Sequence, residues 1–431
     1  MATIEFQYIE SILKEWYAKA IVNQVYTKSP VWSQVKKTSK GVSGKRVYIP
    51  LRKTLSEAVG GLRATENTLH TASGSGYDHT HIYQKRNYGI IQMDGLSMDS
   101  PKGKGGWVDT FKAEAMGISE AFAIEIDQQV MGRGTGILGV ADAANSTTTI
   151  NVNDPHGISE DAPTYMWFRP NMKLQIWDVG THAFLAAAND EMTVASIDPT
   201  NGQFEVGTAP TTALANGDFL CRLGTGSFDS SDDTYEDAIA TGAGDIMGID
   251  RIVDNDQTDF PGDDIDTFQR IAANSTNNPW WRATVNSTRG ILTETKIQED
   301  LDLIEASTDA DAPNLALTTK AIRNKLIEIV KSGRMFSDLK LVGGWDAISY
   351  KGGAVKLPIM VHKFCPTGYI YYLNLKYLKY YTLKKLTWDK SMSGIIKQVS
   401  GEDQFQAWFK MYGNLGTDKR NSMGKGIGYT V

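Results

Sequence analysis

The stretch that decides the fold runs from Gly44 to Asp94 and reads GKRVYIPLRKTLSEAVGGLRATENTLHTASGSGYDHTHIYQKRNYGIIQMD. Lys45–Leu51 alternates apolar and polar residues, which predicts a strand, and His81–Met93 reads as a strand that returns beside it. Two extended legs of about 20 residues, at ~3.3 Å per residue, would reach roughly 60 Å. A two-stranded hairpin of that length has no core of its own and is marginal in water. We therefore expect it to lie on another structure, most simply on a second copy of the chain.

A long amphipathic helix follows the hairpin. Over residues 107–131 the apolar residues recur at a helical spacing and form one stripe along a helix roughly 37 Å long. Acidic residues occupy the other faces, and Gly132 ends the helix. We predict a spine helix with one buried side, formed by Trp107, Phe111, Ala115, Ile118, Phe122, Ile126 and Val130, and with Glu114, Glu120, Glu125 and Asp127 elsewhere on its surface.

After residue 145 the sequence pattern changes to short β segments separated by turn residues. Five strands in roughly 80 residues predict a small β-barrel or sandwich inserted after the helix: Thr147–Val152, Met172–Trp177, Glu191–Ser196, Phe204–Val206 and Phe219–Leu223. Beyond Asn274 helices and strands alternate, which indicates an α+β domain. Its expected helices are Thr295–Ala306 and Thr319–Lys331, its expected strands are Leu339–Val342, Leu357–Phe364 and Tyr369–Leu375, and Gln404–Met411 follows as a returning strand.

The composition of the 431 residues is that of a globular protein, with 41% apolar and 22% charged residues. The formal charge of −6 comes without a basic tract, so it does not predict tight nucleic-acid binding, although it is compatible with enclosing DNA. Cys221 and Cys365 form no CxxC pair, which indicates a reducing compartment. Acidic residues interrupt the first 20 residues, and no apolar run is long enough to span a membrane. We expect a soluble protein made inside the cell.

One glycine-rich motif could indicate a dinucleotide site. Gly134-Thr-Gly136-Ile-Leu-Gly139 matches the GxGxxG pattern, which binds pyrophosphate only between a preceding strand and a following helix. Here the predicted helix precedes the motif and β segments follow it. A glycine turn that ends the helix is the favoured interpretation, and a dinucleotide-dependent enzyme remains an alternative.

Two further groups could bind a cation. His79 and His81 would share one face of a strand, but two ligands are too few for a stable metal site. A series of aspartates lacks the spacing and the closing Glu of a calcium loop, which favours a solvated loop: Asp254, Asp256, Asp259, Asp263, Asp264 and Asp266. We therefore expect no catalytic residue, no cofactor and no metal, with a metal-dependent enzyme as an alternative.

The order of the expected elements resembles that of the major capsid protein of tailed bacteriophages, the Hong Kong 97 fold. The most specific segments are Gly132–Gly139 (GRGTGILG), Asn278–Arg282 (NPWWR) and Tyr371–Tyr377 (YYLNLKY). The resemblance implies an α+β fold in which the hairpin is an E-loop that lies over a neighbouring subunit. The spine helix and long strands would form a peripheral (P) domain, and the α+β part an axial (A) domain.

The resemblance also divides the chain. The expected parts are an N-terminal arm at 1–44, the E-loop at 45–95, a P domain at 96–140 and 380–431, an inserted β domain at 141–228 and an A domain at 229–379. The implied function is a structural, non-enzymatic shell of hexamers and pentamers that encloses double-stranded DNA in the virion and assembles in the host cytoplasm. Scaffolding, portal and decoration proteins are possible partners, and an encapsulin-like compartment shell is an alternative.

We expect contacts between subunits to involve aromatic and basic side chains, which dominate protein interfaces. The candidates are Trp32, Lys45, Arg46, Arg63, His79, His81, Trp280, Trp281 and Arg282. For Trp32 there are two interpretations. It follows Pro30 outside any periodic segment, so it either contacts a neighbouring subunit or packs under the spine helix of its own chain.

Overall fold

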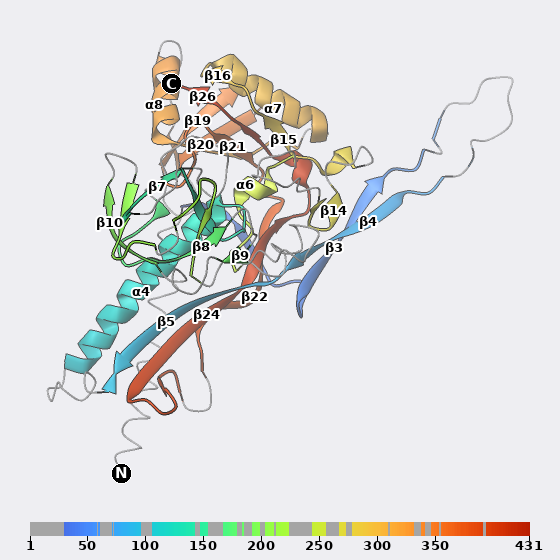
Figure 1. Cartoon of the computed structure of the whole chain (residues 1–431). Coiled ribbons are helices and arrows are strands. Elements are labelled where there is room, and N and C mark those ends of the chain that lie inside the picture. Colours follow the sequence, from blue (N-terminus) through green and yellow to red (C-terminus); the bar gives the residue numbers. More distant parts are fainter. Residues whose placement is uncertain are drawn as a thin grey trace, which may run out of the picture.

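The computed structural model combines helices and strands in the α+β arrangement that the sequence predicts (Figure 1). It describes residues 30–57, 59–60, 71, 73–95, 106–142, 147–153, 167–178, 183–184, 192–198, 203–210, 213–223, 244–255, 267–272, 278–308, 311–331, 338–340, 346–352, 355–390 and 394–431.

A long antiparallel sheet forms the lower part of the molecule in Figure 1. Its centre is β24 (Gln404–Thr417), which pairs with β22 (Leu378–Trp388) along one edge and with β5 (Lys85–Asp94) along the other. The short strand β1 (Lys36–Thr38) adds to β22 in parallel, and β23 (Lys397–Gln398) adds to the start of β24. A glycine allows close packing here, because a Cβ at Gly89 would lie 2.2 Å from the Phe409 ring.

The spine helix α4 (Gly106–Met131) runs beside this sheet, as predicted. Ala115, Phe122 and Ile126 are buried, and the rings of Phe122 and Phe409 meet edge to face at 5.1 Å. Glu114 and Glu120 are exposed, as expected. The side chains of Trp107 and Phe111 lie outside the described residues.

The prediction of a single buried side is wrong for the last two turns of α4. From Glu125 to Met131 every residue is buried except Asp127, which is half-buried. The reason is that two further domains pack around this end of the helix. Gln128 donates to the Trp167 carbonyl of the β insertion, and Asp127 lies 3.0 Å from the His362 imidazole of the α+β part.

The inserted β segment is a closed barrel. Six strands pair in a ring, in the order β10 (Met192–Asp198), β11 (Gln203–Val206), β7 (Thr149–Asn153), β6 (Ile137–Ala141), β12 (Phe219–Arg222) and β8 (Lys173–Asp178), which returns to β10. The strand β9 (Ala183–Phe184) adds to β8. All five predicted strands are present. Because the ring of strands is closed, the segment is a barrel and not a sandwich. The sixth strand, β6, was missed because Gly139 within it and Gly134 and Gly136 before it read as a turn.

The upper part of the molecule is a seven-stranded mixed sheet with two helices on one face (Figure 1). The strand order is β15 (Thr284–Asn286), β25 (Gly424–Gly426), β21 (Ile370–Leu373), β17 (Leu315–Thr318), β20 (Val355–Val361), β19 (Asp346–Gly352) and β18 (Asp338–Lys340). The helices α7 (Glu294–Thr308) and α8 (Lys320–Lys331) match the predicted ones within two residues. Their apolar faces share a core with the sheet, through Ile297, Leu301, Ile304, Ile322, Leu326, Ala316, Ile359 and Tyr372.

Short elements connect these domains. They are α2 (Pro30–Gln34), α6 (Ile249–Ile252), β13 (Thr267–Phe268), β14 (Ile271–Ala272), η4 (Pro279–Trp281), β16 (Gly290–Ile291), η5 (Arg420–Ser422) and β26 (Tyr429–Thr430). The stretch 380–431, which the sequence division gives to the P domain, ends in β25 and β26, and these strands pair with β15, β21 and β16.

The hairpin differs from the prediction in length. The expected returning strand at 81–93 is divided at Gln84, so β4 (Gly76–Tyr83) pairs with β3 (Arg46–Thr54), whereas β5 joins the long sheet. The two-residue strand β2 (Val42–Ser43) adds to β3. Figure 1 shows β3 and β4 extending away from the body of the molecule.

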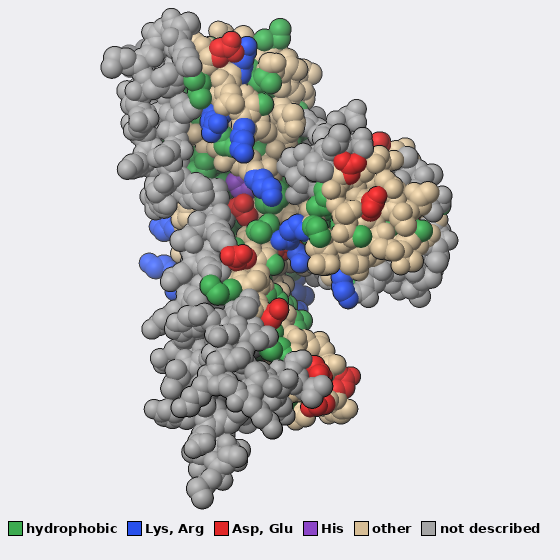
Figure 2. Space-filling model, turned by 90° about the vertical axis from the view of Figure 1, so that its left-hand side faces the viewer, with side chains coloured by type: hydrophobic (Ala, Val, Ile, Leu, Met, Phe, Trp, Pro, Cys, Tyr) green, Lys and Arg blue, Asp and Glu red, His purple; other side chains and the backbone are tan. Residues whose placement is uncertain are grey.

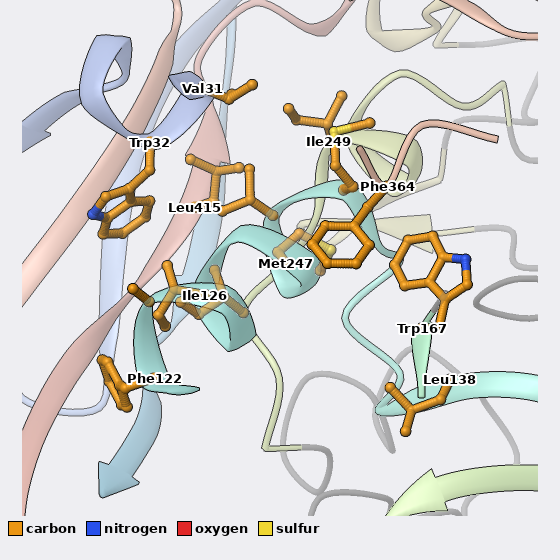
Figure 3. Close-up of a cluster of buried hydrophobic side chains, with 14 of the residues drawn as sticks. Val31, Trp32, Phe122, Ile126, Leu138, Trp167, Met247, Ile249, Phe364 and Leu415 are labelled. Carbon is orange, nitrogen blue, oxygen red and sulfur yellow. The ribbon is translucent and has the colours of Figure 1, made fainter. Parts of the chain in front are cut away.

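The largest core lies where these parts meet. Figure 3 shows the end of α4 surrounded by side chains from separate regions: Val31 and Trp32 from α2, Leu415 from β24, Trp167 and Leu138 from the barrel segment, Met247 and Ile249 near α6, and Phe364 after β20. The spine helix therefore joins the long sheet, the barrel and the upper domain into one packed body.

Candidate assembly surfaces

The base of the hairpin is fixed to its own subunit on one face. Val47 and Ile82 are buried against Tyr381 of β22. The Thr80 hydroxyl donates to the Gln269 carbonyl at 2.6 Å, and the Arg270 guanidinium contacts the Asp78 carboxylate at 2.8 Å. The hydrogen bond from Arg270 lowers the pKa of Asp78 below its ordinary value. These contacts fix the direction in which the hairpin leaves the body.

The opposite face of the hairpin carries exposed aromatic and basic side chains. Tyr48 is opposite His81, and Pro50 is opposite His79, in the β3–β4 register. The Tyr48 ring lies 5.8 Å from His79 and 6.1 Å from His81, and Tyr48 and Tyr77 are 59% and 74% exposed. This arrangement of rings on a projecting strand pair is typical of an interface rather than of a free surface.

Beyond the paired strands, hydrogen bonds keep the two legs of the hairpin together. Ser56 donates to the Ser73 carbonyl at 2.6 Å, and the Glu57 amide donates to the Ser73 hydroxyl at 2.9 Å. The apolar side chains of this tip nevertheless face solvent, with Leu55 61% and Val59 86% exposed. Serine hydroxyls therefore join the described parts of the two legs, while Leu55 and Val59 stay exposed.

A groove of about 490 Å³ lies between β5, the spine helix and the end of β12. Its walls contain three of the exposed large apolar side chains of the chain, Tyr88, Ile90 and Leu223, together with Ile118 and Phe122 of α4. β5 pairs with β24 on one side, and no described strand pairs with its other edge. The groove thus combines an open strand edge with apolar walls.

Charged groups line the inner end of the groove. Glu125 of α4 accepts hydrogen bonds from Arg169, at 2.7 Å, and from Arg222 of β12. Burial lowers the pKa of both guanidinium groups from their ordinary values. Glu125, which we predicted to lie on an outer face of the helix, instead attaches the barrel to the spine.

A buried ionic cluster joins the spine helix to the upper domain. Arg133 contacts Asp250 at 2.8 Å and Asp254 at 2.7 Å, and Lys425 contacts the same two carboxylates at 3.2 and 3.4 Å. The Tyr371 hydroxyl donates to Asp250 at 2.8 Å. All five side chains are nearly inaccessible, so the two cations and the two anions compensate each other's charge inside the protein.

This cluster corrects the prediction of a solvated acidic loop at its first member. Asp254 is 1% exposed and is neutralised by side chains of the protein. The other aspartates of that loop, from Asp256 to Asp266, lie outside the described residues. Sequence reasoning missed the partners because Arg133 and Lys425 are far from the loop along the chain.

Two of the predicted inter-subunit contacts are buried inside the subunit. Trp32 is 1% exposed and packs against Tyr380, with ring centroids 4.5 Å apart. Trp281 is also 1% exposed, and its indole donates to the Phe268 carbonyl at 3.1 Å. The prediction of an intersubunit role is therefore wrong for both, and the alternative of packing beside the spine helix holds for Trp32.

The remaining candidates lie on or near the surface. Lys45 and His79 are exposed; Arg46, His81, Trp280 and Arg282 are half-buried. The Arg46 guanidinium lies 4.4 Å from the centre of the Tyr83 ring. Arg63 lies outside the described residues. The structure brings Arg46, His79 and His81 together on the hairpin, whereas Trp280 and Arg282 lie at η4.

The groove was not predicted from the sequence. Its walls come from β5, α4 and β12, which are distant in sequence and have ordinary alternating or helical patterns. The only available signal was that Tyr88 and Ile90 occupy the polar phase of β5, opposite Gly89 and Ile91. Large apolar residues at these exposed, alternate positions indicate that both faces of the strand pack against other groups.

The motifs that could indicate a dinucleotide or metal site do not lie in the structural context that such a site requires. Gly134 and Gly136 have positive φ angles and lead from the helix into β6, so the motif lacks the following helix that pyrophosphate binding requires. Within the described residues, no group of three His, Cys, Asp or Glu side chains could hold a metal ion. No described helix is long and apolar enough to cross a membrane. On the described part of the face in Figure 2, acidic and basic side chains are interspersed.

No protein-family model and no curated protein matches this chain. Among solved structures, a chain of the cyanophage A-1(L) capsid asymmetric unit is similar at 12% identity and a TM-score of 0.48, with 94% of each chain covered. A chain of Mycobacterium phage Adephagia is 11% identical, with a TM-score of 0.40 over 93% of this chain and 89% of that one. The capsid of an empty GTA particle has 8% identity and a TM-score of 0.43 over 92% and 89%. At these values the likeness by itself assigns neither a function nor a partner.

Proposed function

We propose that the chain is a structural major capsid protein of the Hong Kong 97 type, which self-assembles into the icosahedral head shell of a tailed bacteriophage. The observation that carries the proposal is the β3–β4 hairpin. It projects from the body, and its outer face and tip expose Tyr48, Tyr77, Leu55 and Val59. A hairpin of this kind is stabilised when another copy covers it.

The body of the molecule supports the same function. A shell subunit must keep its shape while several neighbours contact it. The end of the spine helix is packed against the long sheet, the barrel and the upper domain, and the Arg133 cluster adds directional contacts at that junction. Close packing also requires glycine there, because a Cβ at Gly248 would lie 1.8 Å from the Gly132 carbonyl oxygen.

The hairpin would act as the E-loop over a neighbouring subunit, and the upper domain would surround the axes of hexamers and pentamers. Lys45, Arg46, Arg63, His79, His81, Trp280 and Arg282 are the proposed contacts between copies. The shell would enclose double-stranded DNA without sequence-specific binding, in keeping with the net charge of −6. It would assemble in the host bacterial cytoplasm, with scaffolding, portal and decoration proteins as further partners.

Electron microscopy of the purified full chain tests this function. We expect closed shells of uniform diameter, and after co-expression with the other head proteins we expect nuclease-protected DNA inside them. Shells that contain a specific protein and no nucleic acid would indicate an encapsulin-like compartment instead. A stable monomer that never assembles at any concentration would contradict a shell function.

A further inference from the structure

A buried histidine lies where the spine helix, the upper domain and the barrel segment meet. His362 follows β20, and its side chain is completely inaccessible. Its Nε2 atom lies 3.0 Å from a carboxylate oxygen of Asp127 on α4, and its Nδ1 atom accepts the backbone N–H of Phe364 at 3.2 Å. The Phe364 ring in turn contacts the Trp167 ring of the barrel segment, with ring centres 4.9 Å apart. The imidazole therefore connects all three parts of the molecule.

These two contacts determine which nitrogen of the ring carries the proton. A backbone N–H is a donor, so Nδ1 of His362 is the accepting, unprotonated nitrogen, and the proton of the neutral imidazole lies on Nε2 and is donated to Asp127. A second proton would place an N–H group on Nδ1, directed at the N–H of Phe364. Two donors form no hydrogen bond, and a buried amide without an acceptor costs free energy. Protonation of the ring therefore requires the turn at Phe364 to move away.

The charged groups around the ring act on it from different sides. On the α4 side, the Asp127 carboxylate favours a protonated imidazole. On the side of the turn, Lys363 is exposed, and its ammonium group lies 5.2 Å from the centre of the Phe364 ring. The Cys365 thiol is buried and donates to a backbone carbonyl, and the barrel segment contributes the uncharged Trp167. A proton on the ring is thus stabilised by Asp127 at the expense of the Phe364 hydrogen bond.

We propose that His362 is a pH-sensitive switch at this junction. The neutral ring holds the Phe364 turn against the barrel segment. The protonated ring stays with Asp127 and releases the turn, so that the contact between Phe364 and Trp167 opens. Histidine side chains change their charge between about pH 5 and about pH 8, so mild acidification drives the release. The switch lies within one subunit and does not depend on the proposed shell function.

Hydrogen exchange of the dissociated full-length subunit tests the release. A proton that binds only to the released form raises the population of that form by up to about tenfold per pH unit. After correction for the intrinsic rate, the Phe364 and Cys365 amides should therefore exchange about tenfold faster at about pH 5 than at about pH 7. His362→Gln keeps a donor for Asp127 but does not titrate, and it should abolish this acceleration. His79→Gln, at an exposed hairpin position, is the control and should leave it unchanged.

Another buried group titrates in the same pH range and has to be separated from His362. Asp245 is 5% exposed, and burial raises its pKa to about 6. The charges that act on it are those of Arg222 and Lys85. Asp245→Asn should therefore leave the acceleration at Phe364 unchanged. If Asp245→Asn abolishes the acceleration and His362→Gln retains it, Asp245 is the switch and the inference is wrong.

Nitrogen NMR of the histidine-labelled full chain tests the premise without a substitution at His362. At about pH 8 the His362 ring should carry its proton on Nε2 and none on Nδ1. Asp127→Asn removes the carboxylate that favours the protonated ring, so the acceleration at Phe364 should move to lower pH. A proton on Nδ1 at that pH, or an acceleration that stays at the same pH in Asp127→Asn, would overturn the inference. Either result leaves the proposed shell function untouched.

Discussion

The barrel and the hairpin are both made of short strands with alternating side chains, yet they bury them in different ways. In the barrel, six strands pair in a ring, and Ile150, Leu174, Val194 and Phe204 are completely buried inside it. In the hairpin, one face is covered at the base by the subunit, and the other face and the tip are open. In the barrel, every strand of the ring has a neighbour on both sides. In the hairpin, β3 and β4 beyond the base have no second layer of the same subunit over them.

The difference shows where each region obtains its stability. A closed barrel buries apolar area within one chain, so its stability belongs to the subunit. A projecting hairpin gains comparable burial only when another chain covers it, so its contribution belongs to the assembly. Substitutions in the two regions should therefore affect two different measurements, the unfolding of the subunit and the formation of particles.

The largest effect on the subunit is expected in the barrel. Phe204→Ala removes a fully buried ring that stacks on Phe168, with centroids 4.5 Å apart, and should cost about 3–5 kcal/mol of unfolding free energy. Tyr77→Ala, at a 74% exposed hairpin position, is the matched control and should change it by no more than ~0.5 kcal/mol. Denaturant unfolding of dissociated subunits measures both. Equal losses would mean that the hairpin is part of the subunit core.

A smaller effect is expected where the barrel meets the spine. Glu125→Gln leaves Arg169 and Arg222 without their shared carboxylate and should destabilise the subunit by about 1–3 kcal/mol. Glu120→Gln, on the exposed side of the same helix, should be nearly neutral. Thermal unfolding of the two variants measures this difference, and a neutral Glu125→Gln would show that the ion pairs of Glu125 are not needed to hold the barrel in place.

The smallest effect concerns the base of the hairpin and its pH dependence. Because Arg270 lowers the pKa of Asp78 in the folded chain, the pair contributes stability above the ordinary pKa of 3.8 and loses it as the pH falls through and below that value. Hydrogen exchange of β4 amides, corrected for the intrinsic rate, should therefore accelerate on acidification more than that of β11. Arg270→Gln should remove this difference, and an unchanged difference in the variant would point to another group.

The elements that sequence reasoning predicted well are those whose pattern is local. The spine helix, α7, α8 and the five barrel strands each repeat a helical or alternating spacing within one segment. Closure of the barrel was not predictable, because β6 contains Gly139 and lies next to a glycine turn. The division of the expected returning strand into β4 and β5 was missed as well, since both halves alternate and only their partners differ.

The burial of the candidate site residues depends more strongly on contacts between residues that are far apart in the sequence. The sequence left two interpretations of Trp32 open, and Tyr380, almost 350 positions later, is the residue whose ring packs against it inside the subunit. Asp254 looked like part of a solvated loop until Arg133 and Lys425 met it in the interior. In both cases the decisive partner lies outside any sequence window. His79 and His81 share one face of β4, as predicted, because strand alternation fixes that face locally.

We infer that the hairpin tip makes its stabilising contacts between subunits and not within one. Replacing residues 55–74 by a short Gly-Ser linker, with β3 and β4 intact, tests it directly when the unfolding temperature and the sedimentation profile are measured on the same preparation. We predict an unfolding temperature close to that of the natural dissociated subunit and no closed shells. Normal shells from the shortened chain, or a subunit that no longer folds, would contradict the account.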